Sequence, residues 1–179
     1  MKTRRLKAFT MIELMVTVLI LMLLVATAMP SYSRIVNYMK STEAVLNIGK
    51  LFQGAKIYFE NQEAATREGK AVSEVFPPTW DGGCHPAEPT ADKRMPNSQD
   101  WRMSPWTDLQ FEISDPHYYC YNYINMNPGQ QRNATFIVEA RGDLNGDGFQ
   151  SIFSKTGAIS ADGTAVSSPG GLYKFRPNE

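Results

Sequence analysis

The fold is decided by residues 11–29, MIELMVTVLILMLLVATAM, in which Glu13 is the only charged side chain. As an α-helix this stretch would be about 28 Å long, close to the thickness of the hydrocarbon core of a bilayer. The basic residues that precede it are Lys2, Arg4, Arg5 and Lys7. The next basic residue is Arg34. By the positive-inside rule, the stretch predicts a membrane helix with its N-terminus in the cytoplasm and the remaining chain on the outer side.

Length and composition limit what the rest of the chain can be. The 179 residues suffice for one domain with an appendage. The 18 basic and 18 acidic residues balance, but without the N-terminal basic cluster the rest has 14 against 18, a net charge of −4. The chain therefore has no excess of basic residues of the kind that would indicate nucleic-acid binding. With 42% hydrophobic residues, the chain is too apolar for disorder and can bury a modest core.

Three interpretations of the N-terminus compete. An ordinary signal peptide would be cut after residues 26–28, Ala-Thr-Ala, to release a soluble protein that begins at Met29. A plain anchor would never be cut. The third interpretation must explain Glu13, because a carboxylate near the bilayer centre costs about 2.5–3.5 kcal/mol and normally marks function. The first two interpretations leave Glu13 without a role.

Residues 7–14, KAFTMIEL, resemble the processing site of type IV pilins and pseudopilins. The resemblance implies cleavage between Ala8 and Phe9, methylation of the new N-terminal Phe9, and a functional carboxylate at Glu13. Pro30 falls where this family carries a helix-bending proline. Ala8 departs from the usual glycine, so we expect slower processing. The implied processing residues are Lys7, Ala8 and Phe9, and the implied assembly residues are Glu13 and Pro30.

Physical chemistry supports the same interpretation. Cleavage before Phe9 would create an α-ammonium group at the membrane end of the helix, and Glu13 of a neighbouring subunit could pair with it. A buried ion is tolerable when it is paired. The uncharged stripe that could pack helix against helix consists of Leu14, Val18, Leu21 and Val25. The segment is therefore predicted to be a polymerisation device as well as an anchor.

Residues 31–62 contain no proline and keep a helical period, so we expect an amphipathic continuation of the helix. Its predicted inner stripe is Ile35, Tyr38, Thr42, Val45, Ile48, Gly49, Phe52, Ala55 and Phe59. Its predicted solvated face is Lys40, Glu43, Asn47, Lys50, Gln53, Lys56 and Glu60. The resemblance to pilins covers roughly the first sixty residues. The expected domains are a leader over residues 1–8, a helix over 9–62 and a globular head over 63–179.

The head is expected to be rich in β-structure. Glycines and prolines over residues 63–106 predict a loop-rich connector with short local strands. Strand patterns follow at residues 109–113, 118–124, 134–140, 149–153 and 172–175. The predicted fold class is α+β, with a long protruding N-terminal helix packed on a small antiparallel sheet. By resemblance this is the type IV pilin ladle.

Cys84 and Cys120 are expected to form a disulfide, because the outer compartment oxidises thiols. In the chain-entropy model the bridge would contribute about 3–4 kcal/mol. The alternative is a zinc site that adds His85 and His117 to the two cysteines. Adjacent ligands at Cys84 and His85 make that site less favourable, because structural zinc sites space their ligands two to four residues apart.

Residues 141–151, RGDLNGDGFQS, copy the first part of an EF-hand loop. The candidate calcium ligands are Asp143, Asn145, Asp147, the Phe149 carbonyl and Ser151. The glutamate expected at the twelfth position is replaced by Ser154, so the full EF-hand is absent. The alternative is a hairpin turn, because Asn-Gly and Asp-Gly favour such turns. Both interpretations can hold together, and calcium is the one cofactor that the sequence suggests.

No catalytic motif of the serine hydrolase, zincin, P-loop or dinucleotide-binding type occurs, so we expect a protein that is not an enzyme. The predicted function is that of a structural subunit of a type IV pilus-like envelope filament, held in the inner membrane with its head in the periplasm. The implied partners are other pilin subunits, a prepilin peptidase and an assembly platform. The alternatives are a minor pilin or secretion pseudopilin and, from another class, a secreted or anchored calcium-stabilised binding module. Sequence does not distinguish adhesion, motility, DNA uptake and secretion.

Overall fold

The computed structural model describes residues 9–72, 74–129 and 133–177. The chain divides into two compact units, Met1–Val36 and Asn37–Glu179, and the second is called the head unit below. One helix, α1 (Met11–Arg67), begins in the first unit and continues into the head unit. The other elements are η1 (Ser98–Trp101), β1 (Cys120–Asn125), β2 (Thr135–Gly142), β3 (Ser151–Ile159), β4 (Val166–Ser167) and β5 (Leu172–Phe175). The predicted α+β fold class, a long N-terminal helix with a small antiparallel sheet, is confirmed.

Helix α1 continues past the predicted end at residue 62 and stops at Arg67. Gly69 ends it, because its φ of 78° lies in the left-handed region that glycine adopts without strain. The Gly69 amide donates to the Thr66 carbonyl, and the Lys70 amide donates to the Ala65 carbonyl. This pair of bonds is a Schellman motif, which satisfies the last carbonyls of the helix.

The head unit buries one face of α1 against the sheet. The buried positions are Ala44, Ile48, Leu51, Ala55 and Phe59, each at most 1% exposed. Three of these belong to the predicted stripe, but Ile35 and Tyr38 from that stripe are 53% and 63% exposed. The helical period of the sequence predicts the spacing of the buried positions. Which residue of the helix is the first to be buried depends on where the sheet contacts it.

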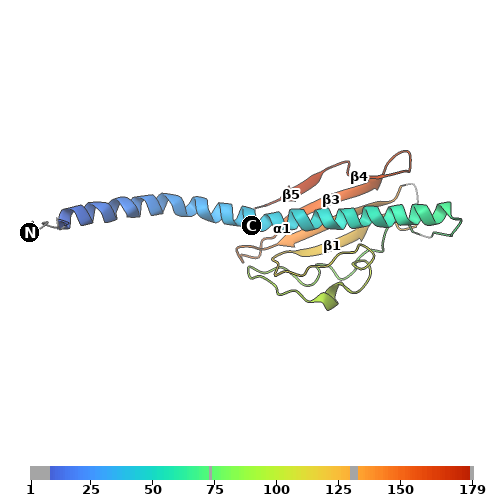
Figure 1. Ribbon diagram of the computed structural model, residues 1–179, viewed down its shortest axis with the longest axis horizontal. Coiled ribbons are helices and arrows are strands. Elements are labelled where there is room, and N and C mark those ends of the chain that lie inside the picture. Colours follow the sequence, from blue (N-terminus) through green and yellow to red (C-terminus); the bar gives the residue numbers. More distant parts are fainter. Residues whose placement is uncertain (1–8, 73, 130–132, 178–179) are drawn as a thin grey trace, which may run out of the picture. The chain divides into compact units, whose positions relative to one another are not determined.

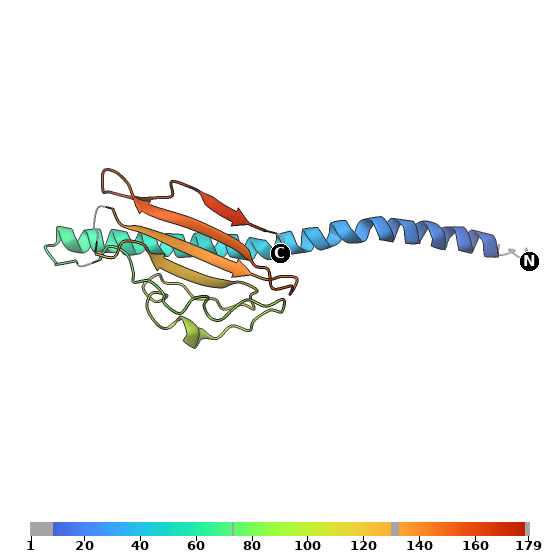
Figure 2. The same ribbon diagram turned by 180° about the vertical axis from the view of Figure 1, so that it is seen from behind.

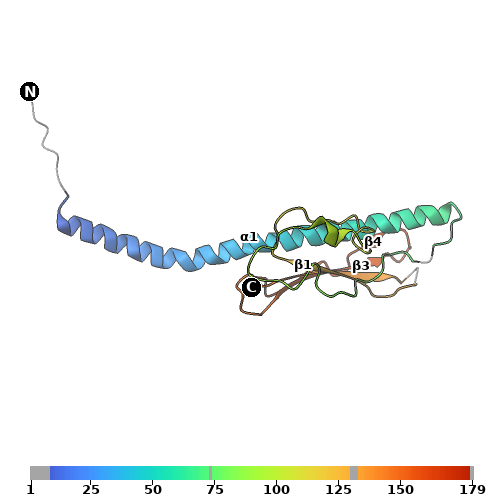
Figure 3. The same ribbon diagram turned by 90° about the horizontal axis from the view of Figure 1, so that it is seen from below.

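The sheet is antiparallel, with the order β1–β2–β3, and both β4 and β5 pair with β3. Figures 1 and 2 show β1 and β5 at opposite edges, with the loop-rich segment beyond β1. In β2 every second residue is buried, including Phe136, Val138 and Ala140. Within the head unit, α1 lies along one face of this sheet (Figure 3). The head unit is therefore a helix layer on a sheet layer.

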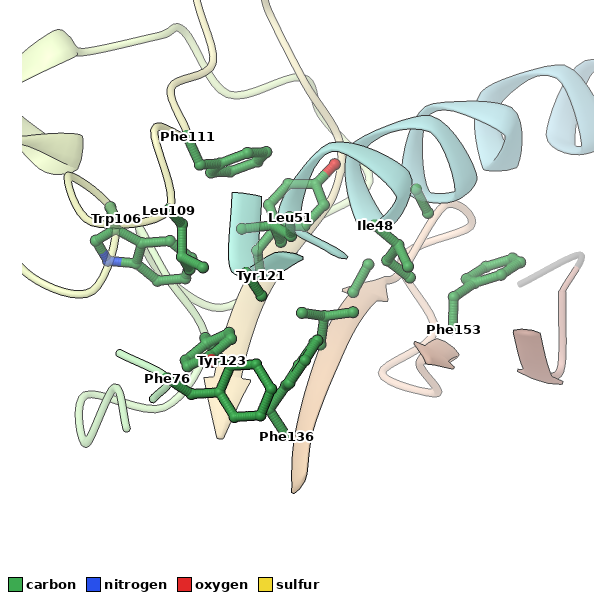
Figure 4. Close-up of a cluster of buried hydrophobic side chains, with 14 of the residues drawn as sticks. Ile48, Leu51, Phe76, Trp106, Leu109, Phe111, Tyr121, Tyr123, Phe136 and Phe153 are labelled. Atoms are coloured by element: carbon green, nitrogen blue, oxygen red, sulfur yellow. The ribbon is translucent and has the colours of Figure 1, made fainter. Parts of the chain in front are cut away.

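Aromatic rings fill the space between helix and sheet (Figure 4). The Phe136 ring lies 5.5 Å from Phe52 on α1, 4.7 Å from Phe76 and 5.6 Å from Tyr123, measured between ring centroids. Gly157 of β3 makes room for it, since a Cβ there would lie 2.2 Å from the Phe136 ring. The core thus depends on a glycine opposite its central phenylalanine.

Residues 74–119, called the strap below, cover the outer edge of β1. The Trp80 amide donates to the Tyr123 carbonyl, and His85 and Tyr121 exchange two backbone hydrogen bonds. The strap holds η1 and two isolated β-bridges but no strand, so the strand predicted at residues 109–113 is wrong. Leu109, Phe111 and Ile113 are nevertheless buried.

Candidate functional site

The apolar segment at residues 11–29 is helical, and all of its side chains are exposed. None of its most apolar stretch is buried against the described part of the protein. Among the described residues, α1 is the single helix that is long and apolar enough to cross a membrane. A helix that is apolar on all sides and covered by none of the described residues needs lipid or other helices around it.

Glu13 closes the N-terminal end of α1. Its Oε2 accepts hydrogen bonds from the Thr10 amide and the Thr10 hydroxyl, both at 2.8 Å. In return, Thr10 Oγ1 accepts from the Glu13 amide at 3.3 Å. This reciprocal arrangement is a capping box, which satisfies amide groups that a helix start leaves without partners. The single chain therefore gives the Glu13 carboxylate an uncharged partner at the start of the apolar segment.

Thr10 is a residue that our sequence analysis missed, although its signal is present. The pattern Thr-x-x-Glu in front of an apolar run is the usual sequence signature of a capping box. Of the predicted processing residues, Lys7 and Ala8 lie outside the described residues, and Phe9 is 78% exposed. The backbone of α1 is helical through Pro30.

The predicted disulfide between Cys84 and Cys120 is present, with 5.4 Å between the Cα atoms, and it ties the strap to β1. Because both sulfur atoms are bonded to each other, the alternative zinc site is wrong. Neither histidine of that site is exposed. His85 packs against three tryptophans, and its Nε2 lies 2.7 Å from the Asp100 carbonyl oxygen. Burial lowers the pKa of His85, so the ring is neutral at ordinary pH.

The calcium-like loop joins β2 to β3 and forms a closed turn. The two carboxylate oxygens of Asp143 accept from the amides of Gly146 and Gly148, at 2.7 and 3.1 Å. The side chains of Asn145 and Asp147 each accept from the amide two residues further on. The predicted hairpin turn is therefore present.

The fit of this loop to calcium is partial. Its side-chain oxygens converge on the loop backbone. Ser151 is fully buried, and its hydroxyl oxygen lies 3.1 Å from the Gly142 carbonyl oxygen and 3.3 Å from the Tyr119 hydroxyl. Among the described residues no group of three or more His, Cys, Asp or Glu side chains could hold a metal ion. Asp143, Asn145, Asp147 and the Phe149 carbonyl would have to supply the ligands, and calcium binding stays a prediction.

A polar cluster that the sequence analysis assigned to the solvated face joins α1 to the strap. Glu43 Oε1 accepts from the amides of Tyr118 and Tyr119, at 3.1 and 3.2 Å. The Asn47 amide group donates to the Tyr121 hydroxyl at 2.7 Å. Burial, and secondarily the Glu43 charge, raises the pKa of Tyr121. Half-buried Glu43 and buried Asn47 thus hold the strap and β1 in place.

Comparison with known proteins identifies the N-terminus. Residues 3–29 match the family model of the prokaryotic N-terminal methylation motif. No curated protein and no solved structure matches the chain. The matched segment includes the capping box and the whole apolar segment at residues 11–29, and it corresponds to the leader and helix start of proteins processed as prepilins. The motif characterises structural rather than enzymatic proteins, and together with the exposed apolar helix it indicates membrane anchoring.

Proposed function

Starting from a prepilin-type N-terminus of the kind found in type IV pilins and pseudopilins, we propose that this chain is a subunit of a type IV pilus-like filament of the cell envelope. One observation carries the proposal: the methylation motif at residues 3–29 contains the helical segment 11–29, whose apolar side chains are all exposed. An anchor needs only that segment, whereas the methylation motif around it points to processing and assembly.

In this proposal, a prepilin peptidase cuts between Ala8 and Phe9 and methylates the new N-terminus. The subunit waits in the inner membrane with its head in the periplasm, and an assembly platform then extracts it. The apolar helix exchanges lipid for the helices of other subunits, which is possible because α1 is uncharged from Leu14 to Met29. The proposal keeps the expected division into a leader over residues 1–8, a helix over 9–62 and a head over 63–179, although helix α1 itself extends to Arg67.

Glu13 has two successive partners in this scheme. In the stored subunit its carboxylate is held by Thr10, which lowers the cost of keeping it at the membrane surface. In the filament it pairs with the α-ammonium group of Phe9 of a neighbouring subunit, since two buried opposite charges offset each other's desolvation. The pairing sets the register of one subunit against the next.

A second candidate is a minor pilin or type II secretion pseudopilin, which would prime or cap a short periplasmic filament. The calcium-like loop between β2 and β3 favours this candidate. Shearing separates the two: a major pilin dominates the sheared surface fraction, whereas a pseudopilin stays with the cells. A calcium-stabilised binding module of another class would keep an unprocessed N-terminus.

The test is the intact mass and N-terminal sequence of the protein recovered from its own cell envelope. We expect a chain that starts at methylated Phe9. A chain that starts at Met29 would make the protein a secreted soluble domain, and an intact Met1 would make it a plain anchor. Either of these two results refutes the filament proposal.

A further inference from the structure

The head unit has an open groove beside α1 that its own chain leaves unfilled. The groove has a volume of about 640 Å³ and is lined by α1 between Glu43 and Ile57 and by residues 109–117 of the strap. At Gly54 the helix and the strap are in direct contact, since a Cβ there would lie 2.0 Å from the Leu109 carbonyl oxygen. At Gly49, by contrast, a Cβ would meet no atom within 4 Å. The missing side chain at Gly49 therefore leaves open space in the groove.

The charge of the groove is predominantly negative. Glu112 and Asp115 line it and are exposed. None of the ion pairs among the described residues involves either of them. Glu43 adds a third carboxylate, and Lys50 supplies a single ammonium group. Leu46, which is 63% exposed, gives the wall an apolar part.

We propose that the groove binds residues 31–39 of a second copy of this chain. This segment of α1 directly follows the apolar membrane stretch and carries large exposed apolar side chains. Tyr32, Ile35 and Tyr38 are 70%, 53% and 63% exposed and follow each other at intervals of three, so they form one stripe. Arg34 lies within this segment, is exposed, and takes part in no ion pair among the described residues.

The segment and the groove are complementary in charge and in length. Arg34 brings a cation to Glu112 and Asp115, and the tyrosine and isoleucine side chains bring apolar surface to Leu46. Nine helical residues are about 14 Å long, and the groove follows α1 for about 21 Å between residues 43 and 57. The segment therefore fits within the groove with its helix intact.

The two surfaces also explain why a second copy is the occupant. They are different parts of one chain, so a contact between them is heterologous, and such a contact repeats from copy to copy in an open series unless its rotation closes a ring. An open-ended repeat is what a filament requires, and the inference rests on the proposed function in this respect. It specifies which head surface holds the helix of a neighbour.

Cysteine cross-linking in intact cells tests the contact. Ser31 and Ser114 are exposed, Ser31 precedes Arg34 by one turn, and Ser114 lines the groove. A copy with Ser31→Cys and a copy with Ser114→Cys, carrying different epitope tags, are expressed together. We expect an oxidised heterodimer in the sheared filaments. The matched control replaces Ser114→Cys by Ser167→Cys, an exposed serine of β4 outside the groove, and should give none.

Two further variants act without cysteine chemistry. Gly49→Leu fills the open space in the groove while favouring the helix, so it should keep the head folded and abolish the cross-link. Arg34→Glu and Glu112→Arg should each reduce the cross-link strongly, and the double reversal should restore it. The groove contact would be overturned if methylated filaments form normally, show no cross-link between Ser31→Cys and Ser114→Cys, and form equally well from Gly49→Leu subunits. That result would leave the proposed function standing. An unprocessed N-terminus or an absence of filaments in the wild type would overturn both.

Discussion

Two glycines of α1 form a matched pair whose substitution tests how the helix packs. A Cβ at Gly49 meets nothing within 4 Å, whereas a Cβ at Gly54 lies 2.0 Å from the Leu109 carbonyl oxygen and 2.9 Å from its carbon. Replacing either glycine by alanine gains about 1 kcal/mol of helix propensity. In Gly49→Ala nothing opposes that gain, so the free energy of unfolding should rise by about 1 kcal/mol. In Gly54→Ala the helix and the strap must separate, and overpacking costs up to about 3 kcal/mol, which leaves a net loss of about 2 kcal/mol.

The assay is urea unfolding of the full-length protein in detergent micelles with the disulfide intact. Tryptophan fluorescence reports the head unit, since all three tryptophans of the chain lie in the strap. The two variants should differ by about 3 kcal/mol in the free energy of unfolding. A Gly54→Ala protein as stable as Gly49→Ala would refute the reasoning, because the helix could not then lie against the Leu109 backbone.

Four other predictions follow from the same contacts. Glu43→Ala leaves the amides of Tyr118 and Tyr119 without their acceptor and should cost about 2–4 kcal/mol in urea unfolding, with Glu43→Gln losing less. Glu13→Ala should remain in the membrane at normal abundance but be poorly incorporated into sheared filaments, and normal incorporation would remove the role assigned to Glu13. Calcium should raise the thermal midpoint of the wild type more than that of Asp143→Asn, and an unchanged wild-type midpoint would exclude calcium binding. Burial raises the pKa of Tyr119 to about 12, so the unfolded chain loses that proton first and stability should fall as pH rises from about 10 to about 12. In alkaline unfolding curves Tyr119→Phe should make this decline less steep, and Tyr121 and Tyr123, whose pKa values burial also raises, should maintain the rest of it.

The strap shows what a sequence pattern does and does not encode. Residues 109–113 alternate, and Leu109, Phe111 and Ile113 are indeed buried. No strand forms there, because Gln110 adopts a left-handed φ of 51° and α1 approaches the Leu109 carbonyl. Alternation predicted burial correctly, whereas strand formation needs a hydrogen-bonding neighbour that the pattern does not contain. The strand predicted at 134–140 has two such neighbours, β1 and β3.

The candidate site was likewise predictable from the sequence only in part. The local signals were readable: an apolar run of membrane length, a carboxylate at its start, and two cysteines that could pair. Glu43 and Asn47 could not be assigned, because their partners are 74 to 78 residues away in the sequence. A helical period places a polar residue outside the apolar stripe. It does not show whether that residue faces water or forms hydrogen bonds with the backbone of a distant loop.

The strap and its disulfide also affect how well neighbouring heads resist aggregation through their sheet edges. With the outer edge of β1 bonded to Trp80 and His85, the open sheet edges among the described residues are those of the short strands β4 and β5. Strand β4 has two residues, β5 has four and carries Lys174, and short, charged edges resist strand addition. In the proposed filament, heads that lie side by side would thereby be protected from merging their sheets into amyloid-like aggregates. Reduction of the cystine would loosen the cover on β1 and expose a second, more aromatic edge to that hazard.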